Sequence, residues 1–216
     1  MQYFTQKNIN DLEKYLQVKQ QESIYEKNLW TIVKKYSSFF SYIPGISCVC
    51  ICNSLAMKSC HENSDIDLFV ITKRNRLWTA RIFLTLFLSI LGKRKNSQNH
   101  AWKFCLSFFI SEEDFSLKNI ALENDIYLAY WIETLIPLVN TYQSYESFMQ
   151  SNKWYEIENQ KKITSHIEYV SMKWSIIWDT IESIFKKLFL GKTKKSFQKL
   201  WKPFGVIISD TMLKFH

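Results

Sequence analysis

The pattern of hydrophobic and polar positions in the first half of the chain predicts an N-terminal helical stretch, followed by strands that alternate with helices. Apolar residues recur at helical spacing through the first forty residues, until Pro44-Gly45 interrupts the pattern. Three compact apolar runs, rich in β-branched or aromatic residues, then predict strands. They cover residues 46–52, 65–72 and 101–110, with a short helix at 55–58 and a longer one at 76–91 that Gly92 should cap.

Beyond residue 115 the same criteria predict helices alone. Helical spacing of apolar residues covers 117–136, 142–152 and 163–190, with a brief segment at 196–201. The change from a mixed to a helical pattern predicts a domain boundary near residue 115. The expected organisation is an α+β domain over residues 1–115, with a short mixed β-sheet and flanking helices, and an all-helical C-terminal domain over residues 116–216.

Composition indicates a folded, helix-rich and basic protein. Hydrophobic residues make up 47% of the 216 residues, enough for a buried core, and the helix-interrupting Gly and Pro number only 4 and 3. The net charge of +8 favours contact with polyanions such as nucleotides, nucleic acid or an anionic membrane face. Lysines concentrate in the last third, where a solvated helical face explains them more simply than a binding patch.

Cysteine usage and hydropathy predict a cytoplasmic protein with no transmembrane segment. The five cysteines include Cys48, Cys50 and Cys52, which share one face of a predicted strand and cannot easily pair with one another. The first ten residues are polar and do not resemble a signal peptide, so the reducing cytosol is expected. The longest apolar run, residues 82–91, is too short to span a bilayer, which takes about 20 residues.

Asp65 and Asp67 are the strongest candidates for chemistry. They stand two residues apart in a predicted strand, so both carboxylates project from one face, with Cα atoms about 6.5–7 Å apart. Two acids on one strand face repel each other unless a cation lies between them, and Mg²⁺ prefers carboxylate and phosphate oxygens. The alternative is that Asp65 merely begins the strand after a turn and Asp67 is an exposed edge residue.

Asn53 and Ser54 lie upstream, where the first predicted strand ends and a short helix begins. Free backbone N–H groups at such a turn can hold a phosphate, and the Ser54 hydroxyl can add a hydrogen bond. The two parts are complementary, because one would bind a triphosphate and the other its metal ion.

These residues resemble the signature of the DNA polymerase β-type nucleotidyltransferase superfamily. That signature is a Gly-Ser pair, a spacer of about ten residues, and Asp-x-Asp followed by apolar residues, which Ser54, Asp65 and Asp67 match over residues 46–75. The chain is similar to small bacterial members with a helical C-terminal half. The resemblance implies a short mixed sheet with helices on one side, and Mg²⁺ bound by the two motif acids.

Two positions differ from that signature. Asn53 stands where the family usually has Gly, and asparagine tolerates the left-handed backbone that such a turn requires. Active members usually have a third acid on a later strand, whereas the predicted strand at 102–110 contains none, and Cys105 or Ser107 should lie near that place. The acids at 112–114 either reach into the site or form a solvated turn. Loss of the third acid would impair catalysis more than nucleotide binding.

The expected function is Mg²⁺-dependent transfer of a nucleoside monophosphate from an NTP to an acceptor: a small molecule, a protein side chain or an RNA end. Asp65 and Asp67 would be the catalytic metal ligands, and Asn53 and Ser54 the nucleotide-binding residues. Two alternatives are a nucleotide-binding module of the same fold with impaired catalysis, and a basic protein that associates with nucleic acid or a membrane surface.

Overall fold

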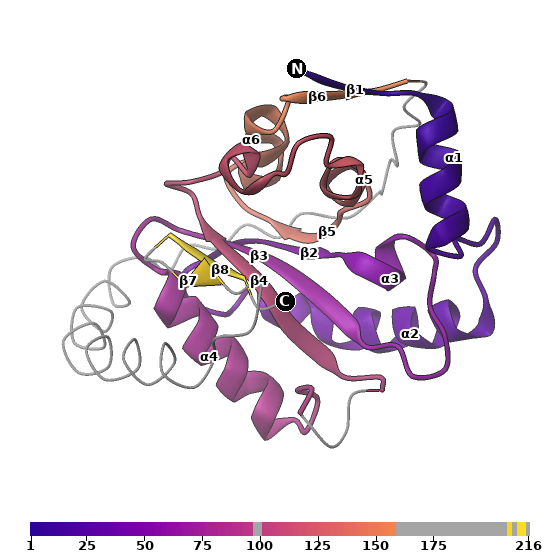
Figure 1. Cartoon of the computed structure of the whole chain (residues 1–216). Coiled ribbons are helices and arrows are strands. Elements are labelled where there is room, and N and C mark those ends of the chain that lie inside the picture. The colour runs from indigo at the N-terminus through magenta and orange to yellow at the C-terminus, as the bar shows by residue number, and fades with distance from the viewer. Residues whose placement is uncertain (97–100, 159–206, 209–210, 215–216) are drawn as a thin grey trace.

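A mixed β-sheet forms the centre of the molecule (Figure 1). The computed structural model describes residues 1–96, 101–158, 207–208 and 211–214. The strand order is β5-β2-β3-β4-β8-β7; β3 and β4 are parallel, and the other neighbours are antiparallel. The strands are β2 (Ile46–Ile51), β3 (Ile66–Thr72), β4 (Phe104–Ser111), β5 (Ile136–Asn140), β7 (Ile207–Ile208) and β8 (Met212–Lys214).

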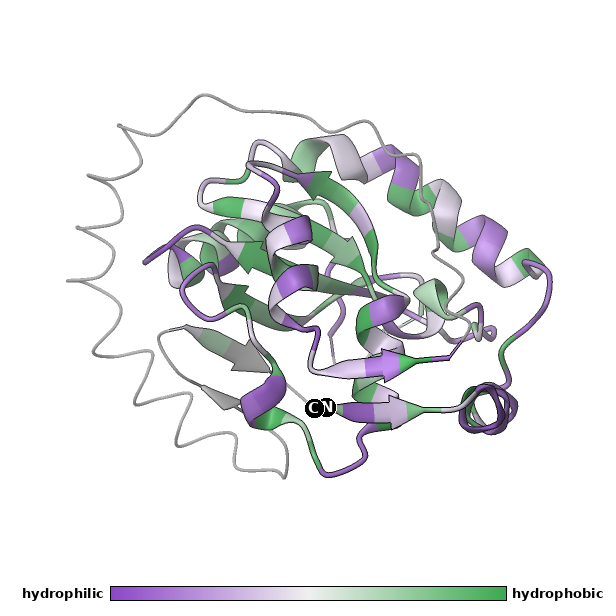
Figure 2. Cartoon of the chain, turned by 90° about the horizontal axis from the view of Figure 1, so that it is seen from above, coloured by the Kyte–Doolittle hydropathy of each residue, from purple (hydrophilic) through white to green (hydrophobic). Residues whose placement is uncertain are grey.

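Helices cover both faces of this sheet, and each face has its own hydrophobic core. The helices α2 (Ile24–Phe40) and α4 (Leu77–Ile90) pack on one face, and α5 (Ile126–Glu133) and α6 (Ser144–Ser151) on the other, with α1 (Gln6–Tyr15) beside α5. Every residue of β2, β3 and β4 is buried, so these strands are continuous apolar runs rather than alternating ones. Figure 2 shows the central strands coloured mainly as hydrophobic. The family resemblance implied helices on one side only, and the structure differs from that expectation.

The central strands and the helix that follows them confirm the sequence prediction. The runs at 46–52, 65–72 and 101–110 correspond to β2, β3 and β4, and the helix at 76–91 corresponds to α4. Gly92 has a φ of +61°, the left-handed conformation of a residue that ends a helix. The α+β class with a mixed sheet is therefore confirmed.

The prediction that the chain beyond residue 115 is helical only is wrong. The expected helix at 117–136 is divided into a short 3₁₀ turn (Lys118–Ile120) and α5, and the chain then enters the sheet as β5 beside β2. Pro137 fits there because β5 is the edge strand, where a missing N–H is tolerated. The helix predicted at 142–152 is present as α6. The helices predicted at 163–190 and 196–201 lie outside the described residues.

Strands from both sides of residue 115 belong to one sheet. The edge strand β5 pairs with β2, and β8 pairs with β4, so the expected boundary does not separate two folding units within the described part of the chain. A second, two-stranded sheet joins β1 (Gln2–Phe4) to β6 (Tyr155–Ile157) in parallel, so the start of the chain is not wholly helical as expected. Within the described ranges, no helix is long and apolar enough to cross a bilayer.

Candidate metal and nucleotide site

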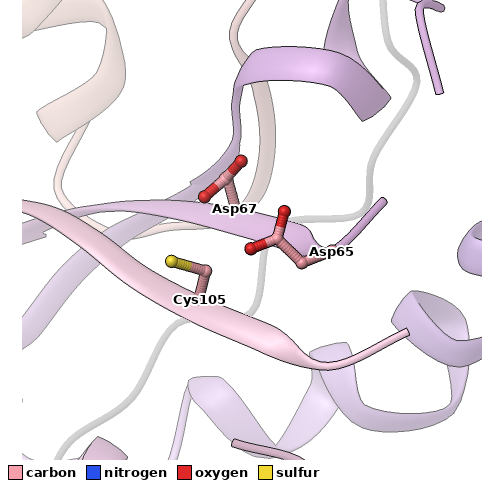
Figure 3. A group of neighbouring side chains, drawn as sticks. All are labelled: Asp65, Asp67 and Cys105. Atoms are coloured by element: carbon pink, nitrogen blue, oxygen red, sulfur yellow. The ribbon is translucent and has the colours of Figure 1, made fainter. Parts of the chain in front are cut away.

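Asp65, Asp67 and Cys105 come together where β3 and β4 begin (Figure 3). Asp65 directly precedes β3, Asp67 is its second residue, and Cys105 is the register partner of Asp67 on the parallel strand β4. One carboxylate oxygen of each aspartate and the Cys105 sulfur lie within 4.8 Å of one another. Asp67 and Cys105 are each 8% exposed, so the cluster is largely withdrawn from water. The prediction that both carboxylates share one face of a strand agrees with this geometry, and Asp67 lies on a central strand rather than at a sheet edge.

An irregularity in β4 determines what stands beside Asp67. The pairing shifts between Asp67–Cys105 and Phe69–Phe108, so β4 carries one extra residue there, a β-bulge. Because of the bulge, both Cys105 and Ser107 lie next to Asp67. The Ser107 hydroxyl donates to Asp67 Oδ1 at 3.2 Å. Both residues expected near the place of the third acid therefore contact or adjoin Asp67.

The acids that follow β4 lie at its other end and have partners there. Glu112 Oε1 accepts from the Ser144 hydroxyl at 2.7 Å, and Glu113 Oε1 pairs with Arg74 Nε at 2.5 Å. Asp114 Oδ2 accepts from the Thr211 hydroxyl at 3.5 Å. Because Cys105 is near the start of the strand and these acids follow its end, they do not reach into the site.

Asn53 connects the two halves of the site. It begins α3 (Asn53–Ala56) with a φ of 54°, so it adopts the left-handed conformation expected of a residue in place of glycine. Its Oδ1 accepts from Trp131 Nε1 of α5 at 2.8 Å, and its side chain also hydrogen-bonds the Asp67 carboxylate. Asn53 thus links the Trp131 side chain, in the core beneath α5 and α6, to the buried carboxylate of Asp67.

Ser54 is half-buried on the same short helix. Its hydroxyl accepts a weak hydrogen bond from the Cys60 thiol at 3.8 Å. The structure therefore brings Asn53 into contact with Asp67, whereas the hydroxyl of Ser54 is turned toward the spacer that precedes Asp65.

Burial and charge shift the titration of the site. Burial, together with the neighbouring Asp65 carboxylate, raises the pKa of Asp67, although hydrogen bonds from Asn53 and Cys105 and the charge of Lys95 oppose the shift. Burial and the charge of Asp67 raise the pKa of the Cys105 thiol to about 12. Cys105 is therefore a neutral thiol near pH 7, which makes it a poor nucleophile.

The donor set fits Mg²⁺ through its two carboxylates. Mg²⁺ is a hard cation that binds one or two protein carboxylates and completes its octahedral shell with water and phosphate oxygens. A protonated thiol adds nothing to such a shell, because thiols suit softer metals and bind them as thiolates. Asp65 and Asp67 are thus the residues that would hold the ion, and Cys105 forms a wall of the site.

Lys95, Trp131 and Glu26 support the site, and sequence reasoning did not assign them to it. Lys95 Nζ lies 2.6 Å from Asp65 Oδ2, yet in the sequence it is one of several basic residues after a helix. Trp131 reads as a core residue, which it also is, since its ring packs against Phe69. Glu26 has a sequence signal, because Ser23-x-x-Glu26 is the capping-box pattern of a helix start.

Glu26 attaches the start of α2 to the spacer between Ser54 and Asp65. It is fully buried, and its Oε1 accepts from the backbone N–H of Cys60 at 2.8 Å, while Oε2 accepts from that of Ser23 at 2.8 Å. Burial alone would raise the pKa of Glu26, but the hydrogen bonds from Ser23 and Cys60 outweigh it, and the pKa is lowered.

We expect Glu26→Gln to destabilise the fold by about 1–3 kcal/mol at pH 7, because one buried acceptor is replaced by a donor and a charged hydrogen-bonding group is lost. Since the folded pKa lies below the ordinary value of 4.5, the wild-type advantage is complete above that value and is lost as the pH falls through the folded pKa. Urea unfolding at pH 7 and pH 3 measures both effects. A Gln variant as stable as the wild type at pH 7 would contradict this role.

No protein-family model matches the chain, and no curated protein sequence is significantly similar to it. The family resemblance therefore rests on the motif around Asn53, Ser54, Asp65 and Asp67 and stays a prediction.

Proposed function

We propose that the protein binds a nucleoside triphosphate with Mg²⁺ at Asp65 and Asp67, and transfers the nucleoside monophosphate to an acceptor hydroxyl. The observation that carries this proposal is the pair of carboxylates of Asp67, which is buried, and Asp65, whose side chain is 16% exposed; one oxygen of each lies within 4.8 Å of the other beside the Asn53 turn. Two acids held this close together in a largely buried place repel each other and need positive charge nearby, an arrangement typical of functional sites.

The reaction is a displacement at the α-phosphorus. The acceptor oxygen forms a bond to that phosphorus, the bond to the β-phosphate bridging oxygen breaks, pyrophosphate leaves, and the acceptor proton passes to solvent. When bound, Mg²⁺ neutralises phosphate charge. Asp65 and Asp67 would orient the ion, and Ser107 and Asn53 would hold the Asp67 carboxylate in place.

A second candidate is nucleotide binding without turnover. It is favoured by the groups beside Asp67 on β4, which are the neutral thiol of Cys105 and the hydroxyl of Ser107. Among the residues that the structure describes, the metal-ligand cluster contains no third carboxylate. A site with two acids would retain the ion that accompanies the triphosphate, and would activate an acceptor hydroxyl weakly.

Calorimetric titration of ATP, GTP, CTP and UTP, each with Mg²⁺ and with a chelator, tests the proposal. We expect at least one NTP to bind the wild type only with Mg²⁺, and that binding to be lost in Asp65→Asn/Asp67→Asn. The matched control is Glu113→Gln/Asp114→Asn, which also removes two negative charges but at the other end of β4, and it should bind as the wild type does.

If well-folded wild-type protein binds none of the four nucleotides, the proposal is wrong. If a nucleotide binds, pyrophosphate release in the presence of small-molecule, protein and RNA acceptors separates the two candidates. Release that depends on both aspartates supports the transferase, and binding without release supports the module.

A further inference from the structure

Lys95 supplies a positive charge inside the aspartate site, at the place where a metal ion is expected. Its Nζ lies 2.6 Å from Asp65 Oδ2, and its charge partly opposes the rise in the pKa of Asp67 that burial causes, so the ammonium group acts on both carboxylates. The side chains of Lys95 and Asp65 are only 32% and 16% exposed. Solvent therefore screens this pair much less than an ordinary surface salt bridge.

The backbone holds Lys95 in this place. After α4 ends, the left-handed Gly92 reverses the chain, and residues 93–95 run beside the start of β4. The Phe104 N–H donates to the Lys93 carbonyl at 2.8 Å, and the Lys95 N–H donates to the Phe104 carbonyl at 2.9 Å. The backbone of Lys95 is thus attached to Phe104, the residue that precedes Cys105, and its side chain extends to Asp65.

An ammonium group at 2.6 Å and a metal ion compete for the same oxygen. A divalent cation bound to Asp65 Oδ2 would have to displace the Lys95 ammonium, because two cations so close together repel strongly in a site of low dielectric constant. The displaced group stays within a side chain's length of the metal, where the phosphates that share the metal's coordination shell would lie.

We propose that Lys95 is a tethered counter-ion, which compensates the aspartate pair in the absence of a divalent cation and contacts the phosphates of the ligand once the metal has displaced it. This inference rests on the proposed function, since it assumes a metal and phosphate ligand at Asp65 and Asp67. It assigns Lys95 two opposed effects: the side chain weakens binding of the metal alone and strengthens binding of the metal–nucleotide complex.

The Lys95→Met variant tests this pair of effects. Removing a competing charge should make Mn²⁺ alone bind roughly tenfold more tightly, and removing a phosphate contact should make ATP bind roughly tenfold more weakly at saturating Mn²⁺. A merely structural role would weaken both. The electron paramagnetic resonance signal of free Mn²⁺ measures the first affinity on the full chain without nucleotide, and calorimetry measures the second.

Two further variants serve as controls. Lys93→Met removes the same charge from the same segment, but Lys93 Nζ lies over the Tyr36 ring at 5.9 Å, so both affinities should equal those of the wild type. Lys95→Arg keeps the charge, and should keep the weaker binding of Mn²⁺ alone. If Lys95→Met does not fold, Lys95→Gln provides the same comparison.

The outcomes separate this inference from the proposed function. If the wild type binds Mn²⁺ through the aspartates but the neutral Lys95 variant binds it no more tightly, Lys95 is not a competitor and the inference is wrong, while the metal site stands. Tighter Mn²⁺ binding with unchanged ATP binding overturns the phosphate contact. If neither protein binds Mn²⁺, both the inference and the proposed function are wrong.

Discussion

Replacing Asp67 by Asn should abolish Mg²⁺-dependent nucleotide binding and at the same time make the folded protein more stable at pH 7. The loss of binding follows from the loss of a metal ligand, and should weaken affinity by at least about 100-fold, beyond what outer-shell substitutions cause. The gain in stability follows from the environment of Asp67, where burial and the Asp65 carboxylate raise the pKa of the side chain. A raised pKa means that the folded state disfavours the ionised form.

The gain in stability of Asp67→Asn over the wild type should depend on pH. Below the ordinary pKa of 3.8 the Asp67 carboxyl is protonated in both states, so the wild type and Asp67→Asn should be equally stable. As the pH rises from 3.8 through the higher folded pKa, the wild type loses stability relative to the variant, and above that range the difference is constant. A difference of 1 kcal/mol would raise the Tm by roughly 2–4 °C in a chain of this size.

Thermal unfolding at pH 3 and pH 7, combined with calorimetric titration, measures both halves of the prediction. Asp65→Asn is the matched control, because it also removes a carboxylate of the site but leaves the Lys95 ammonium without the partner 2.6 Å away. It should lose nucleotide binding with no gain in stability. An Asp67→Asn variant that is less stable than the wild type at pH 7 would show that the Asp67 charge stabilises the fold, contrary to the prediction.

The sequence alone predicts the metal-binding role of the aspartates but not the effect of Asp67 on stability. The two aspartates could be placed on one strand face from their spacing, because alternation in a strand is a local property. Their burial could not be predicted from the spacing, because it depends on β3 lying between β2 and β4 in the sheet. Burial destabilises the ionised Asp67 carboxylate in the folded protein, and this burial results from packing against strands that are distant in the sequence.

The groups around the aspartates depend even more on tertiary structure. Strict alternation along β4 would put Cys105 and Ser107 on one face but would direct Phe108 away from it, whereas the bulge brings Phe108 to the same core as Phe69. Lys95 and Trp131 reach the site from the segment after α4 and from α5. Nothing in the local pattern around either residue distinguishes it from an ordinary surface lysine or core tryptophan.

The errors in the fold have a similar cause. Only Glu133 and Thr134 interrupt the apolar run through α5 and β5, so helical spacing continues into residues that form a strand. The strands β1 and β6 have three residues each, and each exists only because the other lies beside it, about 150 residues away in the sequence. Where an element is long and ends in a clear signal, as α4 does at Gly92, the prediction from sequence is confirmed.

The second large effect concerns Asn53, where we expect Asn53→Ala to destabilise the protein by about 3 kcal/mol. Alanine in the left-handed conformation, at a φ of 54°, costs roughly 1–2 kcal/mol. The substitution also removes the acceptor of Trp131 Nε1 and a hydrogen bond to the Asp67 carboxylate. Trp131 is 5% exposed and Asp67 is 8% exposed, so water replaces these bonds poorly, and an unsatisfied buried group costs roughly 1–3 kcal/mol.

Two other variants divide this loss into backbone strain and hydrogen bonding. Asn53→Gly relieves the strain but lacks the same two hydrogen bonds, so it should be more stable than Asn53→Ala by about 1 kcal/mol and still less stable than the wild type. Asn124→Ala tests strain alone, because Asn124 is exposed with a φ of 56°, and it should cost about 1 kcal/mol.

Urea unfolding of the three variants and the wild type gives these differences directly. If Asn53→Ala lowers the free energy of unfolding no more than Asn124→Ala does, the hydrogen bonds of Asn53 do not stabilise the fold, and Asn53 only provides the left-handed backbone of the turn. If Asn53→Ala is the least stable variant and Asn53→Gly is still less stable than the wild type, the Asn53 side chain positions Asp67. A glycine at position 53 would leave the Asp67 carboxylate without its amide hydrogen-bond partner. Mg²⁺-dependent nucleotide binding should then weaken in Asn53→Gly, even though glycine restores the residue usual in the family that this motif resembles.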